Sequence, residues 1–100
     1  RQILDLMSNH LENPLLVRDI TARVGLSMRQ TERLFAAHLD HPPKAHYRKL
    51  RLQHGRLLIE HTSMSILEIS LATGFSNRRI FSKYYRHEFG FPPSHTRRAP

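Results

Sequence analysis

Two short segments concentrate side chains that can hydrogen-bond to the edges of DNA bases. Arginine and lysine fit guanine O6 and N7, asparagine and glutamine pair with adenine, and glutamate accepts from cytosine N4. Both segments place such residues at helical spacing, opposite an apolar face. The candidate base-contacting residues are Arg29, Gln30, Glu32 and Arg33 in the first segment, and Asn77, Arg78, Arg79, Ser82 and Lys83 in the second.

Three further residues are candidates for contacts to phosphate. Ser27 and Ser76 each precede one polar segment, where a hydroxyl can cap the helix and free N–H groups can bind an anion. Arg86 lies at the far end of the second segment. A single exposed arginine is usually only a solvated charge, so the prediction of DNA contact rests on the two clusters as units.

The elements that carry both clusters form an internal repeat, in residues 20–43 and 69–93. The offset between the copies is 49 residues at the start and 50 at the end, which indicates one extra residue early in the second helix of the second copy. The matched pairs are Ile20 with Ile69, Gly25 with Gly74, Ser27 with Ser76, Phe35 with Tyr85, Leu39 with Phe89, and Pro42 and Pro43 with Pro92 and Pro93.

Each copy is predicted to fold as a helix, a tight turn and a second helix. Gly25 and Gly74 suit the left-handed residue that ends a helix. Ser27 with Gln30 has the spacing of a capping box, and Ser76 is expected to cap the matching helix. The expected inner faces are Thr31, Leu34, Phe35 and Leu39 in the first copy, and Phe81, Tyr84, Tyr85 and Phe89 in the second.

The remaining periodic segments complete an all-α fold of seven helices. An amphipathic segment, 44–61, carries Tyr47, Leu50, Leu57 and Leu58 at helical spacing and would link helix-turn-helix subdomains at 1–43 and 62–100. A helix of this length extends about 27 Å. That is the scale of the ~34 Å between successive major grooves. An opening helix is expected over 2–11 and a last one from Pro93.

Composition favours a nucleic-acid partner. The 100 residues carry a net charge of +8, and the isoelectric point is about 11.1. No apolar run is long enough to span a bilayer, so no membrane partner is expected, and no signal segment opens the chain. The chain begins at Arg1 without Met, and we expect it to be part of a longer, cytoplasmic and nucleoid-associated protein.

Other chemistry finds little support in the residues. His38 with His41, and His54 with His61, could be drawn as metal pairs, but there is no cysteine and no compact acidic cluster to complete a site. Neither a Gly-rich phosphate loop nor a nucleophile motif is present. We therefore expect no metal, no cofactor and no catalytic residue.

The chain resembles the AraC-type DNA-binding domain. The resemblance rests on ITARVGLSMRQTERLF and on LRLQHGRLLIEHTSMSILEISLATGFSNRRIFSKYYRHEFGFPPS. It implies seven helices, a long linker helix and docking of a monomer in adjacent major grooves. By position it implies base contacts from Arg29, Glu32 and Arg33, and from Arg78, Arg79, Ser82 and Lys83. The opening residues look most like the branch with an N-terminal DJ-1/PfpI-like domain. Dimerisation in this family usually belongs to the other domain, so we expect this chain to be a monomer and any dimer to form only in the full-length protein.

Two alternatives stay open. One helix-turn-helix unit could bind RNA polymerase or an effector domain while only the other, more basic one contacts DNA. The chain could instead bind RNA or anionic membranes without sequence preference, with steep salt dependence.

Overall fold

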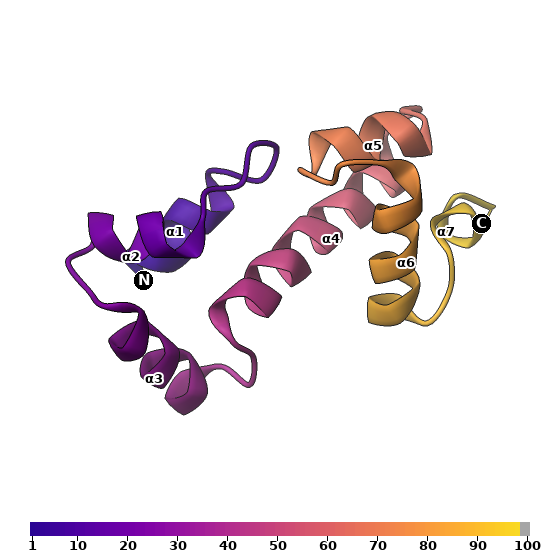
Figure 1. The fold of residues 1–100 in the computed structure, drawn as a ribbon. Coiled ribbons are helices and arrows are strands. Elements are labelled where there is room, and N and C mark those ends of the chain that lie inside the picture. Colours follow the sequence, from indigo (N-terminus) through magenta and orange to yellow (C-terminus); the bar gives the residue numbers. More distant parts are fainter. Residues whose placement is uncertain (99–100) are drawn as a thin grey trace. The chain divides into compact units, whose positions relative to one another are not determined.

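The computed structural model describes residues 1–98 and shows seven α-helices there, with no strand (Figure 1). This confirms the all-α prediction. Residues 99 and 100, the last of the predicted second subdomain, lie outside the described residues. The helices are α1 (Gln2–Ser8), α2 (Val17–Arg23), α3 (Met28–His38), α4 (Pro43–His61), α5 (Ile66–Ala72), α6 (Arg78–Phe89) and α7 (Pro93–Arg98).

The chain forms two compact units, one comprising Arg1–Leu50 and the other beginning at Arg51, so that the boundary falls inside α4. Each unit has its own apolar core. The first core contains α1, α2, α3 and the start of α4, and partly buried leucines surround it. Its buried members are Ile3, Met7, Ile20, Phe35 and Tyr47.

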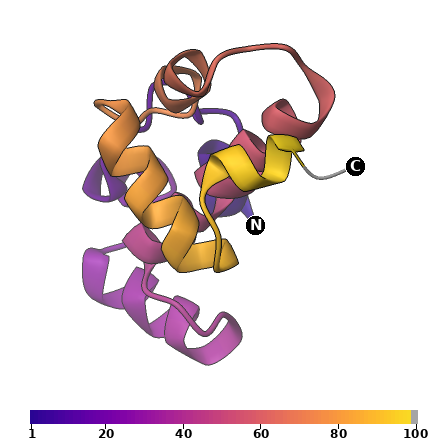
Figure 2. The ribbon, with the colours of Figure 1, turned by 90° about the vertical axis from the view of Figure 1, so that its right-hand side faces the viewer.

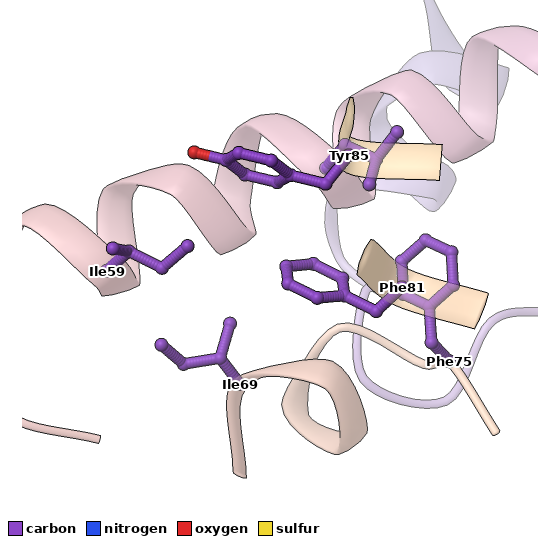
Figure 3. Close-up of a cluster of buried hydrophobic side chains, with 6 residues drawn as sticks. Ile59, Ile69, Phe75, Phe81 and Tyr85 are labelled. Carbon is purple, nitrogen blue, oxygen red and sulfur yellow. The ribbon is translucent and has the colours of Figure 1, made fainter. Parts of the chain in front are cut away.

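The second core is rich in aromatic rings (Figure 3). Phe75 and Phe81 pack edge to face with their centroids 5.4 Å apart, and Phe81 lies 5.5 Å from Tyr85. Such ring pairs stabilise a core by somewhat more than their buried area alone. The buried members of this core are Leu52, Ile59, Ile69, Phe75, Phe81 and Tyr85.

Side-chain hydrogen bonds join segments that are distant in the sequence within each unit. In the first, the Tyr47 hydroxyl donates to the His10 carbonyl at 2.5 Å and accepts from the Leu15 N–H at 3.1 Å. In the second, α7 lies beside the C-terminal part of α4 (Figure 2), where Arg97 donates to the carbonyls of Ile59 and Thr62.

Three expectations about individual residues are wrong. The first helix ends at Ser8 rather than Leu11. There the His10 N–H bonds the Met7 carbonyl three residues back at 3.2 Å, and the His10 ring bonds the Leu6 carbonyl at 2.8 Å. Leu34 and Leu57 were expected to face inward but are 45% and 54% exposed.

Leu52, which the sequence did not single out, is 2% exposed and occupies the core position on α4. The reason is that α4 contributes to two cores: Tyr47 packs in the first and Leu52 in the second. A single apolar stripe along the helix therefore cannot describe it.

Candidate nucleic-acid interface

The two turns that precede α3 and α6 are built alike. Gly25 and Gly74 adopt φ values of 75° and 81°, in the left-handed region that favours glycine. The next N–H reaches back to the preceding helix at 2.9 Å in both units, from Leu26 to the Thr21 carbonyl and from Phe75 to the Ser70 carbonyl. These bonds close each helix, as the glycine positions predicted.

The start of α3 is capped as predicted. Ser27 Oγ accepts from the Gln30 N–H at 3.1 Å, and Gln30 Oε1 accepts from the Ser27 N–H at 2.8 Å. The capping box satisfies two backbone donors that a helix N-terminus otherwise leaves free. It also occupies the Gln30 oxygen, which a bidentate pairing with adenine would need.

The start of α6 differs from the prediction, because Asn77 and not Ser76 is the cap. Asn77 Oδ1 accepts from the Ile80 N–H at 2.8 Å, and α6 begins at Arg78. The extra residue of the second copy therefore lies in the turn rather than in the helix. Ser76 is an exposed turn residue. Ile80 stands where Gln30 stands in α3, so it packs against the core instead of completing a capping box.

The caps give the two helices a common register. Counted from Ser27 and from Asn77, Arg29 matches Arg79, Glu32 matches Ser82, and Arg33 matches Lys83. The members of the first pair lie two residues beyond the cap of their own helix, those of the second pair five residues, and those of the third pair six. Thr31 and Phe35, like Phe81 and Tyr85, are buried on the opposite face of their helices.

The structure places nearly all candidate residues at the surface. Ser82 alone is half-buried, and the Lys83 ammonium lies 5.8 Å from the centre of the Tyr84 ring. Among the candidate residues, the second helix carries four cations and the first carries two cations and one carboxylate. The exposed candidates are Ser27, Arg29, Gln30, Glu32, Arg33, Ser76, Asn77, Arg78, Arg79, Lys83 and Arg86.

Arg51 is a residue that the sequence argument missed. Its guanidinium donates to the Thr73 and Gly74 carbonyls at 2.8 and 2.9 Å, and its Cζ lies 4.2 Å from the centre of the Phe75 ring. These groups belong to the turn before α6. Helical periodicity places Arg51 near the inner face of α4, but spacing alone does not predict carbonyl partners 22 and 23 residues away.

Two further findings concern other kinds of site. Within residues 1–98, no three histidine, aspartate or glutamate side chains gather where they could hold a metal ion. None of the described helices is long and apolar enough to cross a membrane.

Two helix-turn-helix units, each with an exposed second helix bearing cations, define a helix-turn-helix domain of the nucleic-acid-binding class. Residues 20–99 match a family model described as a helix-turn-helix domain. The chain is also 43% identical to a transcriptional regulator from Chromobacterium violaceum described as an AraC-type DNA-binding domain-containing protein. The match covers 96% of this chain and 86% of that one, with a TM-score of 0.93. The chain belongs to the AraC-type DNA-binding domain family.

Curated relatives are longer. The chain is 41% identical over 96 residues to the HTH-type transcriptional regulator CdhR of Pseudomonas aeruginosa, and 42% identical over 99 residues to GbdR of the same species. These matches cover 96% and 99% of this chain but only 29% and 27% of the relatives. The chain thus spans less than a third of their length.

Proposed function

We propose that the chain binds double-stranded DNA at specific sequences, as the DNA-binding part of a bacterial transcription regulator. The observation that carries the proposal is the common register of the two exposed faces. Arg29 and Arg33 lie two and six residues beyond the Ser27 cap, and Arg79 and Lys83 lie two and six residues beyond the Asn77 cap. Each cap follows a turn with a left-handed glycine. A basic surface without this order would support only non-specific binding.

Each second helix would enter a major groove with its N-terminal residues at the base edges. The 19 residues of α4 extend about 28 Å, a length that suits adjacent grooves. The two half-sites would differ, because Glu32 in α3 is matched by Ser82 in α6 and Arg33 by Lys83. One monomer of this chain would then occupy one bipartite, non-palindromic site.

The whole protein would be a regulator whose preceding domain controls this one in response to an effector. This proposal is supported by CdhR and GbdR. Both are named transcriptional regulators, and each is more than three times as long as the segment that matches this chain. The DJ-1/PfpI-like identity of that domain rests on the resemblance of the opening residues. We propose no enzymatic activity for the chain. Because its DNA target would lie on the chromosome, we expect the protein to be found at the bacterial nucleoid.

A second candidate role is that the first unit binds another protein while only the more basic second unit contacts DNA. Its support is that Met28 and Leu34, both on α3, are 40% and 45% exposed. RNA polymerase is the protein that the first unit would then bind. Footprinting separates the two proposals, because two DNA-contacting helices protect about 20 base pairs and a single one protects only one groove.

The decisive experiment is selection of binding sites from random duplexes, followed by affinity measurements on the selected site. Arg33→Ala and Arg79→Ala should each weaken binding by ~1–3 kcal/mol and relax the base preference at one position. Lys44→Ala is the matched control, since it removes one exposed cation outside both recognition helices. Equal losses on selected and random duplexes, or selection of no consensus, would contradict the proposal.

A further inference from the structure

We infer that Arg51 is a positioning residue that sets the orientation of α6, and thereby the base preference of the second unit. The inference rests on the proposed DNA-binding function. It concerns a residue that lies on α4, outside both candidate recognition helices, and is half-buried.

The last carbonyls of a helix lack partners within it. At the end of α5, Arg51 donates Nε–H to the Thr73 carbonyl and an Nη2–H to the Gly74 carbonyl. The planar guanidinium presents these donors in a fixed fork, which a lysine ammonium cannot reproduce. Its charge also complements the negative end of the α5 dipole.

Ring contacts link Arg51 to the recognition helix α6. The guanidinium lies over the Phe75 ring, and that ring packs edge to face on Phe81, the first buried residue of α6. Phe75 precedes the Asn77 cap by only two residues. A displacement of the turn would therefore change where α6 begins and which way Arg79 points.

The turn's own hydrogen bonds return to α5, the helix that it ends. Gly74 has φ of 81° and no side chain, so its own conformational preferences are weak. Three backbone bonds close α5, from Thr73 to Ile69, from Gly74 to Leu71 and from Phe75 to Ser70, and the Thr73 hydroxyl also donates to the Ile69 and Ser70 carbonyls. Arg51 adds the contacts that join the turn to α4, the helix against which the second core is built.

The test compares Arg51→Met and Arg51→Lys with Arg56→Met. Arg56 is a matched control because it also lies on α4 and stacks on rings of the second unit, 4.9 Å from the centre of Phe89. It lies away from the turn and pairs with Glu60 at 3.6 Å. All variants are assayed in the full 100-residue chain at a temperature where circular dichroism shows them folded.

The readout is base preference, which a loss of stability alone does not change. Duplexes carrying single-base changes in the site selected by the unchanged chain are titrated with each variant. We expect Arg51→Met to lose on the order of tenfold in preference under the second unit only. Arg51→Lys should be intermediate, and Arg56→Met should keep the preference.

Three outcomes are informative. Retention of the preference by folded Arg51→Met, or an equal loss with Arg56→Met, overturns the inference while leaving the DNA-binding proposal intact. Failure of the unchanged chain to select any consensus overturns the DNA-binding proposal itself. Should Arg51→Met be unfolded, the amide chemical shifts of residues 78–86 in folded Arg51→Lys decide: no change there relative to Arg56→Met overturns the inference.

Discussion

Single side chains at the two helix starts determine which residues face outward. A cap defines the first turn, and every later residue takes its place around the helix from there. Because Ser27 and Asn77 are the caps, Arg29 and Arg79 occupy equivalent positions. An error of one residue in the cap rotates the expected face of the helix by about 100°.

The identity of the second cap can be tested by a pair of alanine substitutions. Asn77→Ala removes the acceptor of the Ile80 N–H and should lower the free energy of unfolding by ~1 kcal/mol. Ser76→Ala, the neighbouring substitution in the exposed turn, should change it by less than ~0.5 kcal/mol. Urea unfolding of both variants decides, and a larger loss for Ser76→Ala would reverse the assignment.

His46 is the residue whose ionisation opposes the fold of the first unit. Its buried Nδ1 has no hydrogen-bond partner, and its ring contacts Phe35 edge to face at 5.8 Å. Burial lowers the pKa of His46 below its ordinary value of 6.5, and the charges of His41 and Lys49 lower it further. The unfolded chain therefore takes up this proton first as the pH falls.

This order of protonation predicts acid sensitivity in the first unit. The free energy of unfolding should decline as the pH falls through about 6.5, the ordinary pKa of histidine. The part of this decline that is due to His46 should end below the pKa of His46 in the folded state. In an NMR titration the His46 ring should titrate at lower pH than a ring in the unfolded chain. His46→Gln should show a smaller fall in the urea midpoint between pH 7.5 and 5. A fall as large as that of the unchanged chain would exclude this explanation.

The sequence predicts the helices from the residues that end and cap them. Gly25, Gly74 and the Ser27 capping box are local signals, and all three have the predicted conformation. The interior of α4 was harder because its first part packs in one core and the rest in another, so Leu52 is buried where Leu57 was expected. Periodicity reports one face of a helix and cannot show a change of packing partner along it.

Gly55 lies where α4 and α6 approach closely, a tertiary contact that helix propensity does not predict. A Cβ atom at this position would lie 2.9 Å from Phe81 Cε1, and Phe81 is fully buried. Glycine is costly inside a helix by about 1 kcal/mol relative to alanine. Here the missing side chain makes room for the ring that anchors α6.

Gly55→Val should therefore destabilise the second unit by ~1–3 kcal/mol, through displacement of the Phe81 ring. Gln53→Val is the matched control, because it places the same β-branched residue at an exposed position of the same helix. Urea unfolding should show a much smaller change for the control. Equal effects would mean that valine acts through helix propensity, not through the contact with Phe81.

The internal repeat and the positive charge together indicate the partner. The net charge of +8 suits a polyanion, and the duplicated helix-turn-helix pattern narrows it to duplex DNA. The sequence located both clusters and the capping role of Gln30, but it did not show that the side-chain oxygen of Asn77 caps α6. Nor did it predict Arg51, because that contact joins segments 22 and 23 residues apart.

The unlike composition of α3 and α6 predicts an asymmetric binding site. Glu32 favours cytosine by accepting from N4, whereas the matching Ser82 carries no such preference, so each half-site should have its own sequence. Artificial duplexes that repeat either half-site twice, at the natural spacing, should bind more weakly than the selected site by ~1–3 kcal/mol for each lost base contact. Gel-shift titrations at a fixed salt concentration measure this, because the phosphate contacts are the same in every duplex. A palindromic consensus occupied by two copies of the chain would contradict the arrangement, since each copy would then use only one of its two units.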